Sequence, residues 1–127
     1  MEITFRPIGY VQNDFDEPAP PEEIRRTDST IVLNEEFVEG LTGLEAGHWL
    51  LVIYYFDRVQ PPVQMMQHPR GDTNSPKRGL FTLRTPQRPN PIGATVVKIR
   101  DIENNILLVH GLDALNGTPV LDIKLEE

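Results

Sequence analysis

Residues 92–112 read IGATVVKIRDIENNILLVHGL, two apolar runs on either side of a short polar turn. Apolar and basic residues alternate over Val97–Arg100, which is the two-residue period of a strand with one buried face. The turn Glu103-Asn104-Asn105 leads directly into the second run, so residues 92–102 and 106–112 are predicted to form an antiparallel hairpin. This hairpin points the interpretation of the whole chain towards β structure.

The rest of the chain repeats the same pattern. Twelve prolines fall in clusters that separate apolar, β-branched runs, and proline disfavours the interior of helices and strands. Only Glu35–Leu44 is expected to form a helix, capped by Asn34, while Pro18–Arg26 is expected to be a polar loop. Residues 48–58 are apolar on both faces and are expected to form a central strand covered on both sides. Further strands are expected at residues 3–11, 29–33, 79–84 and 120–124.

These elements do not alternate as strand, helix, strand, so a doubly wound (Rossmann) sheet is not expected. The prediction is a mainly β fold with one short helix, either an antiparallel β-barrel or a curled sheet, in a single domain over residues 1–127. Composition is that of a soluble globular protein, with 39% apolar and 24% charged residues and no cysteine. No membrane-spanning stretch or signal pattern is present, so a cytoplasmic location is expected.

The formal charge of −7 argues against tight, sequence-independent binding to nucleic acid. The charge is unevenly distributed, however, because residues 68–88 carry five basic residues against one acid. A local basic patch on an acidic body is therefore compatible with the sequence. Aromatic residues make up 7% and are not interleaved with the basic ones, so the sequence does not indicate a base-stacking platform.

A proline-rich loop precedes the hairpin and reads Arg84-Thr-Pro-Gln-Arg-Pro-Asn-Pro-Ile-Gly93. Prolines stiffen this loop, so the polar side chains that it carries lose little entropy on binding. Arginine offers a planar fork of donors to a carboxylate, a phosphate or a base edge. The same loop can equally be a rigid connection whose arginines pair with surplus acids, so its residues alone leave a binding role open.

A second polar segment follows the hairpin and reads Gly111-Leu-Asp-Ala-Leu-Asn-Gly-Thr-Pro-Val-Leu-Asp122. Main-chain groups at its Asn-Gly turn can contact an adenine edge or a ribose, and Asp113 or Asp122 can hold a hydroxyl, an amine or a proton. A turn stabilised by aspartate, without any function, explains these residues too. Asp57-Arg58 at the end of strand 48–58 is a candidate cleft residue pair or a simple surface ion pair.

Metal and phosphate-loop chemistry is not indicated. The histidines at 48, 68 and 110 lack the spacing of metal ligands, so no metal site is predicted. No glycine-rich phosphate loop follows a strand. The residues alone therefore predict a β-rich domain with a rigid Arg/Asn loop and an acidic turn, and they do not name a cofactor.

Both polar segments resemble motifs of one family, the TrmO (TsaA-like) tRNA methyltransferases. Residues 79–93 resemble its G-x-F-x-T-R-S-P-x-R-P-N-P-I-G, and residues 111–124 resemble its G-x-D-x-x-D-G-T-P-V-[LI]-D-I-K. Pro7–Val11 and Val52–Phe56 are similar to the first and central strands of the family. The likeness covers nearly the whole chain and is to a short, archaeal-like form without the C-terminal domain.

This resemblance implies a non-Rossmann β-barrel enzyme that uses S-adenosylmethionine, bound near the interface of a homodimer. The reaction known for the family methylates N6 of threonylcarbamoyladenosine, next to the anticodon of tRNA. By motif position, Ile24–Arg26 is one candidate cofactor segment. The other implied cofactor contacts are Asp57, Arg58, Arg84, Ala94, Asp113, Ala114, Leu115 and Asn116.

Substrate contacts are hypotheses from the chemistry of the residues and the reaction that the resemblance implies. Arg88 and Asn90 are expected to hold the nucleoside, since an arginine suits the threonyl carboxylate. Arg70, Lys77 and Arg78 are expected to contact the phosphates of the anticodon loop. Asp113 is the first candidate to accept the proton that the acceptor nitrogen must lose.

Departures from the family pattern leave alternatives open. The T-R-S-P motif is Leu83–Pro86 here and keeps the arginine, whereas D-G-T-P is Asn116–Pro119 and loses a carboxylate. The sequence stops at Leu125-Glu-Glu127, before the extension that is expected to help bind tRNA. One alternative is a non-catalytic adenosyl- or nucleotide-binding module. Another is a methyltransferase with a different nucleoside or small-molecule acceptor.

Overall fold

The hairpin predicted at residues 92–112 is present in the computed structural model, which describes residues 1–127. Strand β6 runs over Ile92–Glu103 and strand β7 over Ile106–His110, paired antiparallel. Asn104 in the turn has φ of 54°, in the left-handed region that asparagine tolerates better than most residues. The pairing shifts register between Ile99 and Asp101, a bulge that bends the long strand into a curved wall.

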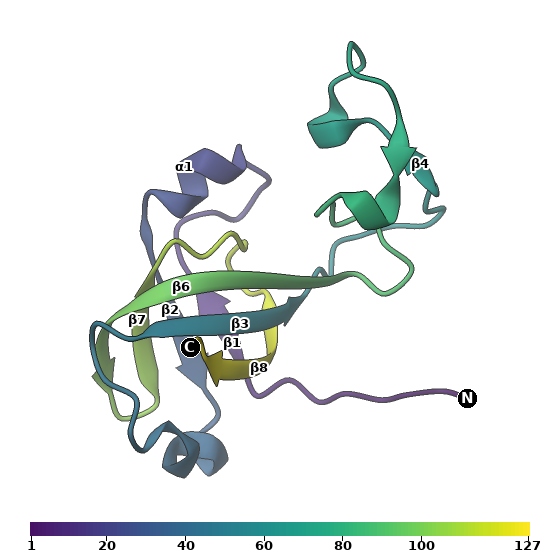
Figure 1. Cartoon of the computed structure of the whole chain (residues 1–127). Helices are drawn as coiled ribbons and strands as arrows, with labels where there is room; N and C mark the ends of the chain where they lie inside the picture. The colour runs from purple at the N-terminus through teal and green to yellow at the C-terminus, as the bar shows by residue number, and fades with distance from the viewer.

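Six strands close into an antiparallel barrel in the order β1-β2-β7-β6-β3-β8 (Figure 1). The other four are β1 Gly9–Gln12, β2 Asp28–Leu33, β3 Trp49–Tyr55 and β8 Pro119–Leu125. Strand β8 closes the barrel by pairing with both β3 and β1, which brings the last strand against the first. The mainly β, non-Rossmann fold predicted from the sequence is therefore confirmed, and of its two proposed forms it is the barrel.

The barrel interior is filled by one side of each strand, with Leu50, Val52 and Tyr54 alternating along β3. The prediction that this strand is covered on both sides is wrong. Its outward residues remain partly or largely exposed, with Trp49 at 51% and Tyr55 at 41%. The first strand is also shorter than predicted, because residues 1–7 run as an extended tail without strand pairing (Figure 1).

The prediction of a single short helix at Glu35–Leu44 needs correction. The segment forms a 3-10 helix, η1 Glu35–Leu41, and Asn34 makes no side-chain cap. The α-helix of the chain is α1 Pro21–Arg25, inside the segment expected to be a loop. A proline and two acids in the first turn favour helix entry there, and Ile24 is buried and fixes the helix to the body.

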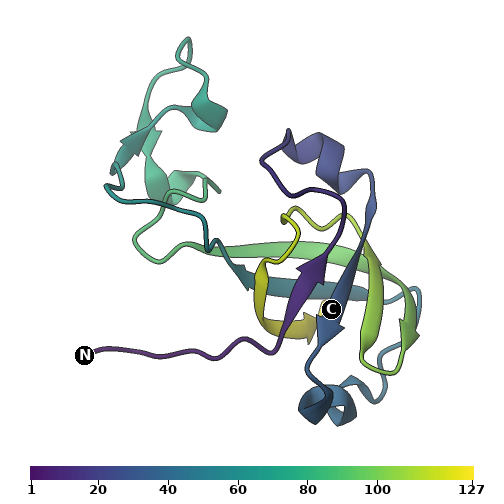
Figure 2. The same ribbon diagram turned by 180° about the vertical axis from the view of Figure 1, so that it is seen from behind.

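Residues 56–91 leave the barrel between β3 and β6, and we call this segment the arm. It contains β4 Met66–Gln67, η2 Pro69–Gly71, β5 Arg78–Gly79 and η3 Leu80–Thr82. The strand predicted at residues 79–84 is wrong, because the Thr82 hydroxyl donates to the Gly79 carbonyl and closes a 3-10 turn. Figures 1 and 2 show the arm and α1 rising from the same side of the barrel.

None of the helices has the length and apolar character that a membrane crossing requires.

Candidate functional site

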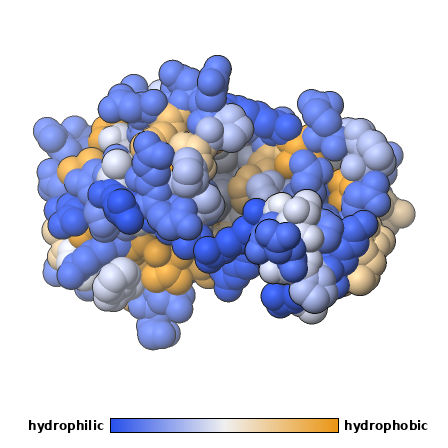
Figure 3. Space-filling model, turned by 90° about the horizontal axis from the view of Figure 1, so that it is seen from above, coloured by the Kyte–Doolittle hydropathy of each residue, from blue (hydrophilic) through white to orange (hydrophobic).

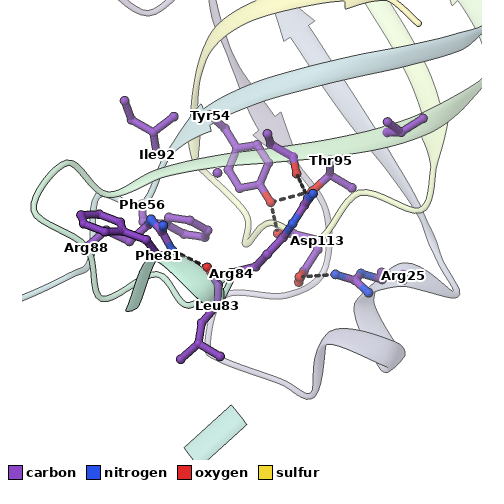
Figure 4. A pocket seen from close by; sticks show the side chains of 13 residues that line it. Arg25, Tyr54, Phe56, Phe81, Leu83, Arg84, Arg88, Ile92, Thr95 and Asp113 are labelled. Atoms are coloured by element: carbon purple, nitrogen blue, oxygen red, sulfur yellow. Dashed lines mark hydrogen bonds and ion pairs between the residues drawn. The ribbon is translucent and has the colours of Figure 1, made fainter. Parts of the chain in front are cut away.

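A cavity of about 520 Å³ lies between the arm, the start of β6 and the loop that follows β7. Seen from above in Figure 3, it is a hollow between two lobes, with apolar residues in its walls and hydrophilic residues around it. Figure 4 shows its lining at close range. The lining residues are Arg25, Tyr54, Phe56, Phe81, Leu83, Arg84, Arg88, Ile92, Gly93, Ala94, Thr95, Val96 and Asp113.

The first half of β6 presents an open sheet edge to this pocket. Residues 92–97 pair with β3 on one side only, because the register with β7 begins at Lys98. On the free side the carbonyl of Ala94 accepts a hydrogen bond from Arg84 Nη1 at 3.2 Å. Ala94 and Val96 both line the cavity, and the N–H and C=O groups of these two residues point away from β3. Main-chain donors and acceptors are thus available to a ligand there.

Tyr54 joins the strand floor to the loop that carries Asp113 (Figure 4). Its hydroxyl donates to the main-chain carbonyl of Asp113 at 2.8 Å, so the Thr95 hydroxyl, also at 2.8 Å, must donate to it. Burial raises the pKa of Tyr54 to about 12. The hydrogen bond from Thr95 lowers this pKa, but its effect is smaller than that of burial. The phenol is therefore a neutral, fixed donor at physiological pH.

Asp113 faces the pocket in an ion pair with Arg25, whose Nη2 lies 3.2 Å from Oδ2. The two side chains come from the loop after β7 and from α1, 88 residues apart in sequence. Ile24 is 3% exposed and anchors α1, which places the next residue over the cavity. Of the candidate segment Ile24–Arg26, the structure thus brings Arg25 into the site.

The two arginines of the proline-rich loop are used differently. Arg88 Nη1 donates to the carbonyls of Leu83 and Thr85 at 2.8 and 3.3 Å and so holds the loop in shape. Arg84 instead reaches across the pocket to β6. Both line the cavity together with Asp113, so the two polar segments singled out in the sequence meet at one site.

Several predicted cofactor residues lie apart from this cavity. Arg58 donates to the carbonyls of Asp16 and Asn116 at 2.8 and 2.5 Å. The Asn116 side chain accepts from the Asn13 main-chain N–H and donates to the Asp16 carboxylate. Both residues therefore fasten neighbouring loops to each other. Ala114 is 4% exposed within the core, and Leu115 is partly buried beside it.

Asp57 and Asn90 line a second hollow, with the N-terminal tail on its other side. Of the substrate candidates, therefore, only Arg88 lines the first cavity.

The other three substrate candidates, Arg70, Lys77 and Arg78, are exposed on the arm. Arg70 lies 3.7 Å from Glu22 of α1, so the arm and the helix approach each other across the top of the site. Arg78 donates to the Thr82 carbonyl at 3.0 Å and braces η3.

Reasoning from sequence missed the aromatic part of the pocket. Tyr54 is one of several apolar residues in a strand, and nothing in that run marks its hydroxyl as a clamp. Phe81 did have a signal, because it occupies the phenylalanine of the motif at residues 79–93. The fold brings this ring to the same cavity as Arg84 and Arg88, so aromatic and basic residues that are not interleaved in sequence are adjacent in space.

The structure thus defines a class: a small closed barrel with an arginine-rich cavity beside an open strand edge. The model of the tRNA-methyltransferase O N-terminal domain matches residues 9–125. The chain belongs to this family.

Curated relatives and solved structures agree with this assignment. A probable S-adenosyl-L-methionine-binding protein of Methanocaldococcus jannaschii is 42% identical over 107 residues, which cover 80% of this chain and 85% of that protein. An S-adenosyl-L-methionine-binding protein of Archaeoglobus fulgidus is 40% identical over 125 residues, covering 96% and 88%. The crystal structure of TrmO superposes with a TM-score of 0.78 at 32% identity. That match covers all of this chain and 58% of the TrmO chain.

Proposed function

We propose that this protein is an S-adenosylmethionine-dependent methyltransferase that acts on N6 of threonylcarbamoyladenosine, next to the anticodon of a tRNA. The observation that carries the proposal is the meeting of Arg84 and Asp113 in one cavity beside the open edge of β6. Membership of the tRNA-methyltransferase O family supports the RNA substrate. The chain spans little more than half of the TrmO chain that it resembles, so activity on tRNA is a proposal for this chain. The cavity and the arm support this proposal.

The cofactor is S-adenosylmethionine, for which the archaeal relatives are named. The cavity fits such a molecule. Its volume of about 520 Å³ falls among the pockets of about 300–1,000 Å³ that hold small ligands. Arg84 suits a carboxylate, Asp113 suits an ammonium or ribose hydroxyls, and the free edge of β6 suits the polar edge of an adenine.

When bound, the cofactor supplies an electrophilic methyl group on a sulfonium. The protein's part is to hold the acceptor nitrogen in line with that methyl, at a separation of about 3–3.5 Å, and to exclude water. Arg88 and Asn90, on two sides of the proline-rich loop, are proposed to hold the nucleoside. The carboxylate of Asp113 is proposed to accept the proton that the acceptor nitrogen gives up. Tyr54 fixes the main chain at that aspartate.

RNA binding is proposed to involve the exposed cations of the arm. Arg70, Lys77 and Arg78 all lie on it and are exposed, and they are proposed to contact phosphates of the anticodon loop. A cytoplasmic location follows from this proposed substrate.

A homodimer is also proposed, and the outer face of the barrel supports it. Leu51, Ile53 and Tyr55 on β3 lie beside Val96, Ala94 and Ile92 on β6 in register. These residues form an apolar strip on the outside of the barrel that borders the cavity, because Ile92, Ala94 and Val96 also line that cavity. Within the strip Val96 is 43% and Ile92 38% exposed. A second copy of the chain is the proposed cover for this surface.

The cofactor role is tested by calorimetry with S-adenosylmethionine. Arg84 is exposed, so Arg84→Ala is expected to fold normally and to bind the cofactor at least tenfold more weakly, through loss of a charge-assisted contact. Arg100→Ala is a matched control, because Arg100 lies on the same strand wall but pairs with Asp28 outside the cavity. Equal affinities for Arg84→Ala and the wild type contradict the proposed contact.

The reaction is tested by nucleoside mass spectrometry of tRNA incubated with protein and S-adenosylmethionine. A methyl group on threonylcarbamoyladenosine is the expected product. Cofactor binding without any methylated nucleoside would indicate the non-catalytic module instead. A methyl group on another nucleoside would keep the enzyme class and replace the acceptor.

A further inference from the structure

Phe81 is the most exposed aromatic side chain of the arm, at 79%. Its backbone is nevertheless held in place. The preceding residue, Leu80, is 1% exposed and donates its N–H to the Met65 carbonyl at 2.8 Å. Leu83 N–H donates back to the Leu80 carbonyl at 3.0 Å. A buried anchor and a closed 3-10 turn therefore present this ring outwards in a fixed place.

The ring of Phe81 lies at the wall of the cavity. Phe81 lines it together with Arg84 and Arg88, and Phe56 lies at the same end (Figure 4). The surrounding segment, residues 68–88, carries five basic residues against one acid in a chain of net charge −7. An exposed aromatic face beside guanidinium groups is the arrangement with which proteins bind unpaired bases of RNA, because every base has a π-face to stack.

We propose that Phe81 stacks against an unpaired purine of the RNA loop, and that this base is the one presented for methylation. The identity of that base rests on the proposed function. The stacking itself requires only that the arm binds a single-stranded RNA loop. The basic residues of the arm favour RNA over a protein partner at this ring, because they can contact the phosphates that flank a stacked base.

Binding of a short anticodon stem-loop RNA tests this proposal without any methyl transfer. Phe81→Leu keeps an apolar side chain but removes the π-face, and it is expected to weaken RNA binding by about 5- to 150-fold, the range that corresponds to removal of one stacking aromatic side chain. Phe81→Tyr keeps the face and is expected to bind as the wild type does. Tyr10→Leu is the matched control, because Tyr10 is an aromatic residue that is 46% exposed on β1 and lines neither of the two cavities described above.

A stem-loop with an abasic site at the acceptor position identifies the stacked base. Phe81→Leu and the wild type are expected to bind this RNA equally, since nothing is left to stack. Trp49 is the single tryptophan of the chain, so Trp49→Phe combined with Phe81→Trp leaves one tryptophan, placed at the pocket, whose emission can be excited selectively. Its emission is expected to be quenched by the intact stem-loop and to remain unchanged with the abasic one.

Four results would overturn the proposal. They are absence of stem-loop binding by the wild type, equal binding by Phe81→Leu, an equal loss of S-adenosylmethionine affinity in Phe81→Leu, and conversion of a dimer to a monomer by that substitution. The last would assign the ring to a second copy of the chain. Stacking on RNA without a methylated product would leave the stacking role of Phe81 standing, and would remove the proposed reaction and the claim that the stacked base is the methyl acceptor.

Discussion

Tyr54 shows how one hydroxyl can organise a site whose residues come from distant segments. Its ring is 2% exposed, and its single proton points to the Asp113 carbonyl. The loop that follows β7 is thereby fixed against the strand that forms the pocket floor. A donor with a pKa of about 12 does not ionise under physiological conditions, so this bond persists over the whole working pH range.

Tyr54→Phe should change the pH dependence of stability. Tyrosine ionises near pH 10 in the unfolded chain but near 12 in the folded protein, so the folded wild type binds more protons between these values. Its free energy of unfolding relative to the variant is expected to fall by about 1.4 kcal/mol per pH unit between pH 10 and about 12, the folded pKa of Tyr54. Below pH 10 the wild type is expected to be the more stable, by about 1 kcal/mol for the lost bond.

Urea unfolding of both proteins at pH 7, 10 and 11 measures this difference. A difference that does not change with pH would show that the hydroxyl titrates as freely in the folded state as in the unfolded chain.

Gly93 on β6 packs against the rings of Tyr54 and Phe56, which leave no room for a side chain at this position. A Cβ added there would lie 2.5 Å from Tyr54 Cε2 and 2.8 Å from Phe56 Cζ. The rings pack edge to face with centroids 5.3 Å apart and would have to move. Gly93→Ala is therefore expected to destabilise the protein by about 1–3 kcal/mol in urea unfolding. Gly40→Ala is the control, because nothing lies within 4 Å of its added Cβ, and a loss of similar size there would contradict the steric cause.

Three strands meet at one exposed carboxylate on the barrel wall. Asp28 of β2 accepts from His110 of β7 at 2.8 Å and from Arg100 of β6 at 3.1 Å. Partial burial alone would raise the pKa of Asp28, but the hydrogen bonds and charges of these two partners outweigh it and lower the pKa. The aspartate thus helps to set where β2 joins the hairpin.

Asp28→Asn is expected to destabilise the folded state at neutral pH. The pKa of Asp28 is lower in the folded protein than its ordinary value of 3.8, so its contribution is fully present above that value and is lost as the pH falls through the folded pKa. Thermal unfolding from pH 2 to 7 is expected to show the two proteins converging at the acidic end. Asp122→Asn, whose partner Lys124 is on the same strand, controls for charge removal alone, and equal effects would contradict a cross-strand role.

The sequence predicted the barrel elements best where a local signal was strong. The Asn104 turn and the alternation after Ile92 define the hairpin, and it forms within two residues of the expected limits. The predicted helix at Glu35 and strand at Gly79 failed for a shared reason. Short segments rich in glycine or threonine form 3-10 turns through local hydrogen bonds, which periodicity does not detect.

The candidate site was predictable in part. Arg84 and Asp113 were identified from motifs, and the fold brings them into one cavity. Arg25 was included only within a broader segment, because the five-residue helix that aims it depends on the burial of Ile24. The role of Tyr54 and the open edge of β6 both depend on how distant strands pair, and that pairing could not be predicted from the sequence alone.

At the level of the whole molecule, the apolar strip outside β3 and β6 determines the expected assembly. Leu51→Glu places a charge within the strip, beside Val96, and is expected to convert a dimer into a monomer in light scattering coupled to size exclusion. Ile106→Glu is the control, since Ile106 is 36% exposed on β7, away from the strip. A dimer that survives Leu51→Glu and dissociates with Ile106→Glu would relocate the interface.

The half-paired stretch of β6 has a consequence for the integrity of the barrel. This six-residue stretch has no strand partner on one side, and the main-chain groups that its alternate residues present there would accept an extended peptide as an additional strand. The arm stands over this stretch, and the guanidinium of Arg84 already occupies the Ala94 carbonyl. A chain in which residues 57–91 are replaced by a tight turn should therefore polymerise through this strand, so the segment that forms the pocket also guards against fibril growth.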